Sequence, residues 1–523
     1  MGLGVYEKGG DVAIGGGKVF VSGRDRIVVA TPNGTIAGAI TGLSGAVGLA
    51  AASDGSHVYA ALSGSNQVAE IDTDTLAITR RIDVEYPCPT NLSLSGTQLL
   101  VGYGHGYECD GPGGGVFSLD LSAEAPEPVQ IQNGFSRAPL VAAAKNTLVV
   151  SLDNQLPAHL FVYDLNGSSA TLRGTIDGSM YNPDLSGPID LTVTADGSTL
   201  VTAFGNPEQF ESWNTTTLTR VRTYQPPALY PHAVAVSPDG AHIAGGSYDR
   251  VRIYNTATAE SAYTDDNQTG NVVPGSLTFS GPDVLGVIRA ANTGRLYLWR
   301  VQGALLPPST MTLSAPSTAT ALEPLTLTGR LTAPDGSAMG AQPVSVTRRL
   351  PDGTTATVAH AATMADGTFT ITDTPPVAGE LRYEATWAGS SDIRWSSASA
   401  IVTVGKHESS LTLSGPAKGK VGKQFQLTGA VNIGGQPPAP RAWVKVLRTI
   451  SDSNGTVTTS QWMVGLVSDG SFGFTETPAV DGHYTYTVQW AGDSLGLPVE
   501  ASHEVAVKTE EEGGMAGNAA SEG

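Results

Sequence analysis

A unit of about 40–45 residues recurs seven times within the first 300 residues of the chain. Each copy contains an apolar strand, a tight turn, a second apolar strand and a third strand that ends near Asp or Asn. Two copies read GPIDLTVTADGSTLVTAF (residues 187–204) and HAVAVSPDGAHIAGGS (residues 232–247). A repeat of this length with several short strands is typical of a β-propeller. The sequence therefore predicts an all-β fold, with a seven-bladed β-propeller over residues 1–306.

The repeats also predict how the ring of blades closes. Six copies carry a fourth, more polar strand, which is expected to be outermost, whereas the seventh copy lacks one. We expect residues 2–6 to supply that strand, since a closed ring leaves no long open sheet edge; the alternative is a frayed terminus. The first hairpin of each copy turns at Gly16-Gly17, Asp54-Gly55, Ser95-Gly96, Lys145-Asn146, Asp196-Gly197, Asp239-Gly240 and Pro282-Asp283.

From residue 309 the period lengthens to about 100 residues, the length of an immunoglobulin-like sandwich. The sequence Thr-Leu-Ser at residues 312–314 returns at 412–414, and Trp-Ala-Gly at 387–389 returns at 490–492. Alternating strands lie between these repeated segments, and neither copy contains cysteine. We predict two Ig-like β-sandwich domains, at residues 309–405 and 406–508, followed by a disordered acidic and glycine-rich tail at 509–523.

The charge of the chain restricts its partners. The net charge is −19 at pH 7, which disfavours binding to nucleic acid or to anionic membranes, because both attract clustered Lys and Arg. No apolar stretch reaches 18 residues, so we predict no membrane insertion. The first residues do not resemble a signal peptide. The chain is therefore either cytoplasmic or the mature form of an exported protein.

Two cysteines bear on that choice. Cys88 and Cys109 both fall in the third repeat, and we predict a disulfide between them, which would indicate an oxidising compartment. No cysteine or histidine spacing typical of a metal site is present, so we predict no metal and no cofactor. We favour an extracellular or cell-surface location, with the cytoplasm as the alternative.

Two sets of motifs resemble known families. VAVSPDG at residues 234–240 and VAEIDT at 68–73 resemble the propeller repeats of bacterial surface-layer and YncE-type proteins, although the third and fourth repeats lack the Ser-Pro-Asp-Gly turn. YEATWAG at 383–389 and YTVQWAG at 486–492 resemble the Ig-like repeats of actinobacterial exported proteins. The resemblance implies binding in the cell envelope or outside the cell more than catalysis.

The loop that enters each innermost strand is expected at the mouth of the central channel. Four neighbouring repeats place an aromatic residue there, and basic residues accompany two of them. Flat rings with a few polar groups suit stacking on sugars or gripping a peptide; the alternative is that they pack the rim. The candidate ligand-binding residues are Tyr86, Phe135, Arg137, Tyr181, Tyr230 and His232.

No catalytic residues are predicted. Neither a Gly-X-Ser-X-Gly elbow nor a His-Glu-X-X-His motif occurs, and the entry loops offer mainly Glu85 and Asp184 as acids. The favoured hypothesis is a secreted or cell-surface binding protein, whose propeller recognises a carbohydrate or protein partner and whose Ig-like domains act as spacer or second contact. The alternatives are a hydrolase or lyase that acts on an extracellular polymer at the channel mouth, and a structural component of an extracellular assembly.

Overall fold

The computed structural model describes residues 2–6, 9–106, 109–153, 155, 157–177, 187–205, 208–226, 230–266 and 270–510, with backbone alone for 2–6 and 109–112. The chain divides into two compact units, Met1–Leu306 and Pro307–Gly523. Every regular element in the described residues is a β-strand, so the prediction of an all-β fold is confirmed. The tail predicted at 509–523 lies almost entirely outside the described residues.

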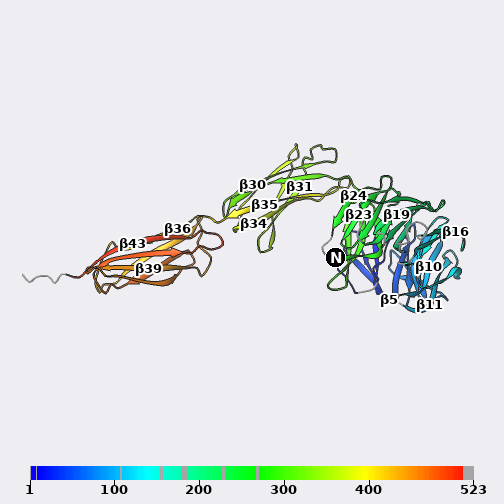
Figure 1. The fold of residues 1–523 in the computed structure, drawn as a ribbon, viewed down its shortest axis with the longest axis horizontal. Helices are drawn as coiled ribbons and strands as arrows, with labels where there is room; N and C mark the ends of the chain where they lie inside the picture. Colours follow the sequence, from blue (N-terminus) through cyan, green and yellow to red (C-terminus); the bar gives the residue numbers. More distant parts are fainter. Residues whose placement is uncertain are drawn as a thin grey trace, which may run out of the picture. The chain divides into compact units, whose positions relative to one another are not determined.

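The first unit consists of antiparallel sheets whose strands follow one another in chain order (Figure 1). One seven-stranded sheet holds β2 (Val12–Gly15), β3 (Lys18–Ser22), β4 (Arg24–Ala30), β5 (Ile36–Ala51), β6 (His57–Leu62), β7 (Gln67–Asp72) and β8 (Ile78–Asp83). Four-stranded sheets are formed by β9 (Pro89–Ser95), β10 (Gln98–Gly106), β11 (Cys109–Asp120) and β12 (Val129–Phe135), and by β13 (Leu140–Ala144), β14 (Thr147–Ser151), β15 (His159–Asn166) and β16 (Ser169–Asp177).

The remaining sheets of this unit also have four strands each. They are β17 (Pro188–Val193), β18 (Thr199–Phe204), β19 (Gln209–Asn214) and β20 (Arg220–Thr223); β21 (Pro231–Val236), β22 (His242–Ser247), β23 (Arg250–Asn255) and β24 (Ser261–Asp266); and β25 (Gly270–Ser280), β26 (Asp283–Ala290) and β27 (Arg295–Val301) with β1 (Gly2–Tyr6). β1 pairs antiparallel with β27, so the start of the chain completes the sheet of the last repeat.

The long strand β5 explains why one sheet has seven strands. Its first part, residues 36–41, pairs with β4, whereas residues 49–51 pair with β6. β5 therefore serves as the outer strand of the first repeat and continues as the inner strand of the second. The two repeats are joined without a loop between them.

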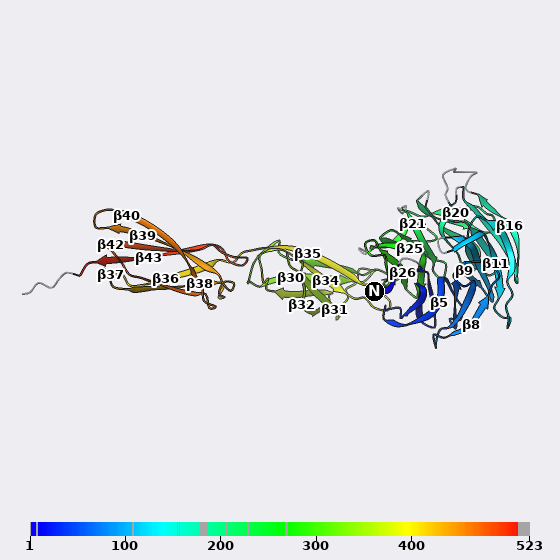
Figure 2. The same ribbon diagram turned by 90° about the horizontal axis from the view of Figure 1, so that it is seen from below.

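The inner strands of the sheets contact one another in a closed order. β2, the second half of β5, β9, β13, β17, β21 and β25 each contact the next, and β25 contacts β2 again. The outer strands are more polar, as the alternating exposure of β8 shows, and β8 and β16 lie at the periphery of the unit in Figure 2. The sheets thus have the arrangement of blades around a central channel.

Apolar side chains between neighbouring sheets form the core of the ring. Val19 and Val28, from β3 and β4, pack in one cluster with Leu285 and Leu298, from β26 and β27. All four are at most 6% exposed, and burial of such a side chain contributes about 1.5–3 kcal/mol. The first and last sheets are therefore held together by the same kind of layer that joins the others.

The second unit contains two copies of a two-sheet arrangement. The first pairs β28 (Thr310–Ser314), β30 (Leu325–Thr332) and β33 (Thr368–Asp373) in one sheet, and β29 (Thr318–Thr320), β35 (Ser396–Gly405), β34 (Gly379–Trp387), β31 (Pro343–Arg349) and β32 (Thr355–Ala362) in the other. The second repeats this order with β36 (Ser409–Ser414), β38 (Phe425–Ile433) and β41 (Ser471–Glu476), and with β37 (Lys418–Lys420), β43 (Val499–Lys508), β42 (Gly482–Trp490), β39 (Trp443–Asp452) and β40 (Val457–Gly465).

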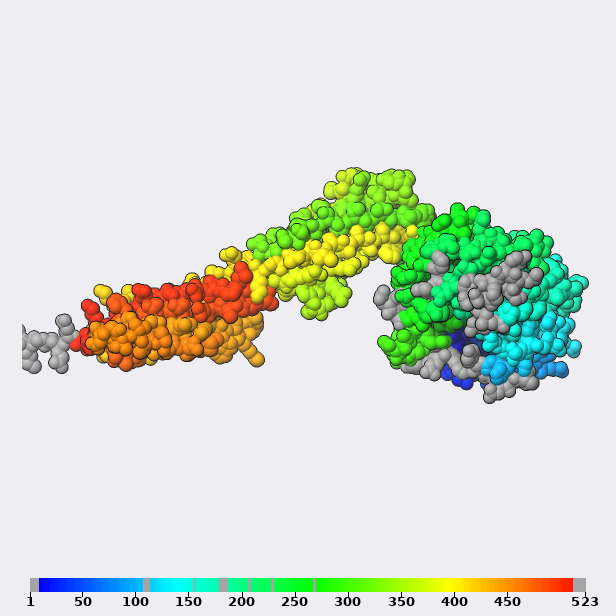
Figure 3. Space-filling model, viewed as in Figure 1, coloured from blue at the N-terminus to red at the C-terminus, as the bar shows by residue number. Residues whose placement is uncertain are grey.

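The tryptophans of the repeated Trp-Ala-Gly motif anchor these two cores. Trp387 ends β34 and Trp490 ends β42, and both side chains are almost completely buried between their sheets. Figure 3 shows the surface of the second copy, coloured orange to red, as one continuous body. We call the two copies the first and second sandwich.

Glycine permits neighbouring sheets to approach closely. A Cβ atom on Gly48 of β5 would lie 2.0 Å from the carbonyl oxygen of Thr90 in β9, and one on Gly102 would lie 2.2 Å from the carbonyl oxygen of Pro139. Because both obstacles are backbone atoms of the next sheet, no side-chain rotation can relieve the overlap.

We therefore expect Gly48→Ala to lower the free energy of unfolding by about 1–3 kcal/mol or more, because the two inner strands must move apart. Gly106→Ala is the matched control, since no atom of the described residues lies within 4 Å of its added Cβ. Chemical denaturation of the two variants measures the difference. Equal stability of both variants would show that the strand contact does not hold the ring.

Candidate functional site

Two of the aromatic residues predicted at the channel mouth are packed into the sheets. The Tyr86 ring lies 4.8 Å from the ring of Phe117, stacked upon it, and 4.5 Å from that of Tyr103. Phe135 is buried, with its ring 5.7 Å from that of Phe161. These contacts favour the rim-packing interpretation for Tyr86 and Phe135.

Arg137 is held by one partner. Its Nε lies 2.8 Å from Oδ1 of Asp153, and its guanidinium also donates to the carbonyl oxygen of Asp153. Both side chains are about one-third exposed, so this ion pair contributes little to stability. Tyr181 lies outside the described residues.

The sixth repeat, which forms β21–β24, presents the most exposed aromatic rings near the predicted site. Tyr230 is 46% exposed and lies 5.1 Å, centroid to centroid, from Tyr248, which is 38% exposed. The His232 ring meets Tyr248 edge-on at 5.4 Å, and its Nδ1 donates to the carbonyl oxygen of Val272 at 3.1 Å. Burial lowers the pKa of His232. Of the predicted residues, Tyr230 and His232 therefore lie together. Both contact Tyr248, which was not among the predicted residues.

Two carboxylates on the channel wall were missed by the sequence analysis. Asp11 precedes β2, and both its oxygens accept backbone N–H groups: Oδ2 from Leu49 of β5 at 2.6 Å and Oδ1 from Val12 at 2.8 Å. Asp190 of β17 accepts from Val234 of β21 at 2.7 Å and from Leu191 at 2.8 Å. Each carboxylate thus bridges two neighbouring inner strands. The sequence feature that could have identified them is an acidic residue at or near the start of an inner strand that is otherwise apolar.

The surroundings of these carboxylates make them weak acids. Burial raises the pKa of Asp11 to about 7, against the opposing effect of its backbone hydrogen bonds. Burial likewise raises the pKa of Asp190 to about 7, and the charge of Asp11 adds to this rise. Asp11 nevertheless keeps some solvent contact, whereas Asp190 is buried. The two groups are therefore close enough to sense each other's charge.

A wide hollow lies at the opposite end of the inner strands. It has a volume of about 810 Å³ and is lined by the turns that follow the inner strands of five repeats. We call this hollow the hairpin basin. Its lining comprises Ser53, residues 94–98, residues 143–146, Leu165, Gly167, Val193, Ala195 and residues 236–238.

The basin is polar but nearly uncharged. Hydroxyl and amide side chains, such as Thr97, Gln98 and Asn146, lie among alanine, proline, leucine and valine, and Lys145 is the charged residue among those that line it. Lys145 also lies near the Asp196 carboxyl, whose pKa neighbouring hydroxyl and backbone donors lower to about 2. Such a lining suits a neutral polar ligand that offers many hydroxyl or amide groups.

The described residues provide no group of three or more His, Cys, Asp or Glu that could hold a metal ion. They also include no helix with the length and apolar character needed to span a bilayer.

The structure describes the side chain of only one of the two cysteines in the predicted disulfide. Cys88 is buried, its N–H donates to Oδ1 of Asn66 at 3.0 Å, and its carbonyl oxygen accepts from the N–H of Gly104 at 3.2 Å. The backbone of Cys109 pairs with Gly106, but its side chain lies outside the described residues. The pairing of Cys88 with Cys109 stays a prediction.

Comparison with known proteins assigns neither a family nor a function to this chain. No family model matches the sequence, and no significant match exists among curated proteins. Similar solved structures include hydrazine synthase of Kuenenia stuttgartiensis, at 14% identity and a TM-score of 0.46, covering 57% of this chain and 97% of that one. The β-propeller domain of Cps50 (Swd1) from Myceliophteria thermophila is similar at 12% identity and a TM-score of 0.43, covering 56% of this chain and 96% of that one.

The blade-like sheets around a closed ring of inner strands define the first unit as a β-propeller. The likeness to the solved structures is too weak to assign an activity, because many functions share this fold.

The raised pKa values of Asp11 and Asp190 predict a specific pH dependence. Since the folded-state pKa of about 7 exceeds the ordinary value of 3.8, the stabilising proton is fully bound near pH 4 and is lost as the pH rises through 7. We expect Asp190→Asn to be the less stable protein at pH 5, because its amide nitrogen cannot accept an N–H. The deficit relative to the native protein should shrink by roughly 1–3 kcal/mol between pH 5 and pH 8.

Thermal melting of both proteins at several pH values measures this difference. The lowered pKa of His232 acts on stability with the opposite sign, but His232 is present in both proteins and cancels in the comparison. A deficit that stays constant from pH 5 to pH 8 would contradict the raised pKa.

Proposed function

We propose that this chain is a secreted or cell-surface binding protein that recognises a carbohydrate or protein partner of the cell envelope. The observation that carries the proposal is the hairpin basin, a hollow of about 810 Å³ with hydroxyl and amide side chains and a single lysine. Sugars and peptide backbones present matching hydrogen-bond donors and acceptors. The exposed pair of Tyr230 and Tyr248 offers a second, stacking surface near the entry to an inner strand.

The proposal includes a seven-bladed propeller and two Ig-like domains. Seven inner strands contact one another in a closed order, and the pairing of β1 with β27 supports closure by the N-terminal strand. The pairing of a three-stranded with a five-stranded sheet around a buried tryptophan supports an Ig-like assignment for each sandwich. We assign the sandwiches the role of spacer or second contact.

Export is part of the same proposal. Cys88 is not a free thiol, which supports its pairing with Cys109, the other cysteine of the chain. A disulfide persists in an oxidising compartment and is rare in the cytosol.

A hydrolase acting at the channel is the second candidate, because Asp11 and Asp190 are carboxyl groups with pKa values near neutrality. Against it, every oxygen of both carboxylates already accepts a backbone N–H, so these groups serve the inner strands first. Binding at the basin remains the function that the geometry supports best.

Blocking the basin tests the proposal. Thr97 and Ala195 line the basin and are exposed, so Thr97→Trp combined with Ala195→Trp should fill it without disturbing the core. We expect binding to an array of envelope glycans, or capture of envelope proteins, to weaken at least tenfold (about 1.4 kcal/mol). The control is Ser65→Trp, which places the same side chain on an exposed turn at the other end of the strands.

The double variant Tyr230→Ala with Tyr248→Ala distinguishes binding at the tyrosine pair from binding at the basin. Loss of binding in this variant, with full binding by the basin variant, would move the site to the predicted channel mouth. Turnover of an array glycan that disappears in Asp190→Asn would favour the hydrolase instead.

The location is tested by intact-mass measurement of the protein from medium, envelope and cytosolic fractions. We expect extracellular material in which two alkylation adducts appear only after reduction, because both thiols are held in a disulfide. Free labelling of both thiols in protein confined to the cytosol would contradict the proposed export.

A further inference from the structure

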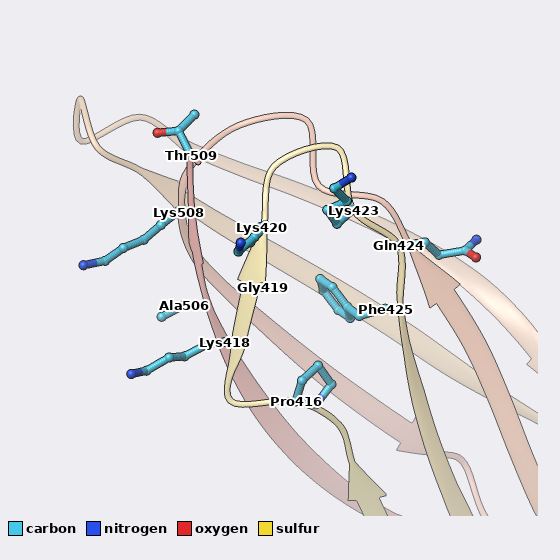
Figure 4. Close-up of a pocket in the computed structure, with 10 residues that line it drawn as sticks. All are labelled: Pro416, Lys418, Gly419, Lys420, Lys423, Gln424, Phe425, Ala506, Lys508 and Thr509. Carbon is cyan, nitrogen blue, oxygen red and sulfur yellow. The ribbon is translucent and has the colours of Figure 1, made fainter. Parts of the chain in front are cut away.

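A groove at one end of the second sandwich differs in charge from the rest of the chain. It has a volume of about 480 Å³ and lies between β37, the end of β43 and the segment that leads into β38 (Figure 4). Phe425 and Pro416 form an apolar wall, and four lysines are among the other residues that line the groove: Lys418, Lys420, Lys423 and Lys508. We call this feature the lysine groove.

Lysine is far more frequent in this groove than in the chain as a whole. The chain has nine lysines and a net charge of −19, yet four of the nine line this one groove. A local positive potential on an acidic protein attracts anions to that place alone.

A carboxylate already contacts the groove. Nζ of Lys420 lies 2.9 Å from Oε1 of Glu510, the last described residue. Lys420, and after it Lys423, lower the pKa of the Glu510 carboxyl. Among the described residues, Lys420 forms an ion pair, whereas Lys418, Lys423 and Lys508 do not. Three of the four ammonium groups therefore have no carboxylate partner within that part of the chain.

In the first sandwich, the end that corresponds to the lysine groove is covered by another part of the chain. β29 pairs with β35 as β37 pairs with β43, so Thr320 and Gly405 stand where the second sandwich has Lys420 and Lys508. At this end Leu322 packs against the cores of both sandwiches. The carboxylate of Glu323 lies 3.6 Å from Nε2 of His407, which belongs to the second sandwich. This end of the fold therefore accepts a polypeptide neighbour through an apolar contact and an oppositely charged pair.

We propose that the lysine groove docks an acidic segment of a separate protein, rich in Asp and Glu, with an apolar side chain against Phe425. Four lysines that line a groove with an apolar wall match a segment of that chemistry. The apolar wall of Phe425 and Pro416 favours a polypeptide over a phosphate polymer, because a phosphate polymer offers no apolar side chain to pack against it. This site is independent of the hairpin basin, so either can fail alone.

The experiment uses the full chain and a fluorescein-labelled peptide of ten glutamates interrupted by one leucine. Lys418→Gln with Lys423→Gln should weaken binding at least tenfold, and affinity should fall as salt rises. The matched control is Lys406→Gln with Lys445→Gln, which removes the same charge from the same unit outside the groove and should change the Kd less than twofold. Thermal melting confirms that both variants are folded.

Four results would overturn the proposal. The first is no binding of the peptide to the native chain, and the second is equal weakening by both double variants, which would reflect net charge alone. The third is tighter binding of tripolyphosphate than of the peptide, which would identify a phosphate ligand. The fourth is peptide binding that appears only after Glu510, Glu511 and Glu512 are changed to Gln, which would make the chain's own C-terminus the occupant.

Discussion

The propeller depends on lateral contact between the inner strands of neighbouring sheets. Each sheet is a small antiparallel meander that buries its faces only against the next sheet, and a closed order of contacts gives every sheet two neighbours. Apolar layers supply the attraction, and Gly48 and Gly102 allow the backbones to approach closely enough for those layers to form.

Polar side chains near the starts of the inner strands form hydrogen bonds from one strand to the next. Asp11, Asp190 and His232 each reach the backbone of the next inner strand. Asn91 does the same, donating through Nδ2 to the carbonyl oxygen of Pro139 at 2.8 Å. The polar side chains at the entry ends are thus occupied by contacts between strands. The hairpin ends are also linked, since Oγ of Ser95 donates to the carbonyl oxygen of Lys145 at 2.5 Å, but their turns still enclose an open, polar basin. The basin is therefore the better candidate for ligand binding.

Most of the fold could be predicted from the sequence, and less of the site. Turns such as Asp54-Gly55 and Asp239-Gly240 mark their hairpins because glycine accepts the positive φ that the turn needs. The entry-loop aromatics were identifiable as a set, but their burial was not. Tyr86 and Phe135 pack into clusters, while Tyr230 stays exposed beside Tyr248, a residue more than fifteen positions away in the sequence.

The sequence by itself determined what local chemistry controls: the strands, their turns, the repeat lengths and the change of period near residue 309. Only the tertiary structure decided which side chains from distant repeats share one environment. It placed Asp11 and Asp190 close enough for one charge to raise the other's pKa, opened the basin among turns of five repeats, and brought four lysines to the lining of one groove. The physical reason is that strand formation depends on neighbouring residues, whereas burial, electrostatic potential and cavity shape depend on distances between residues far apart in the chain.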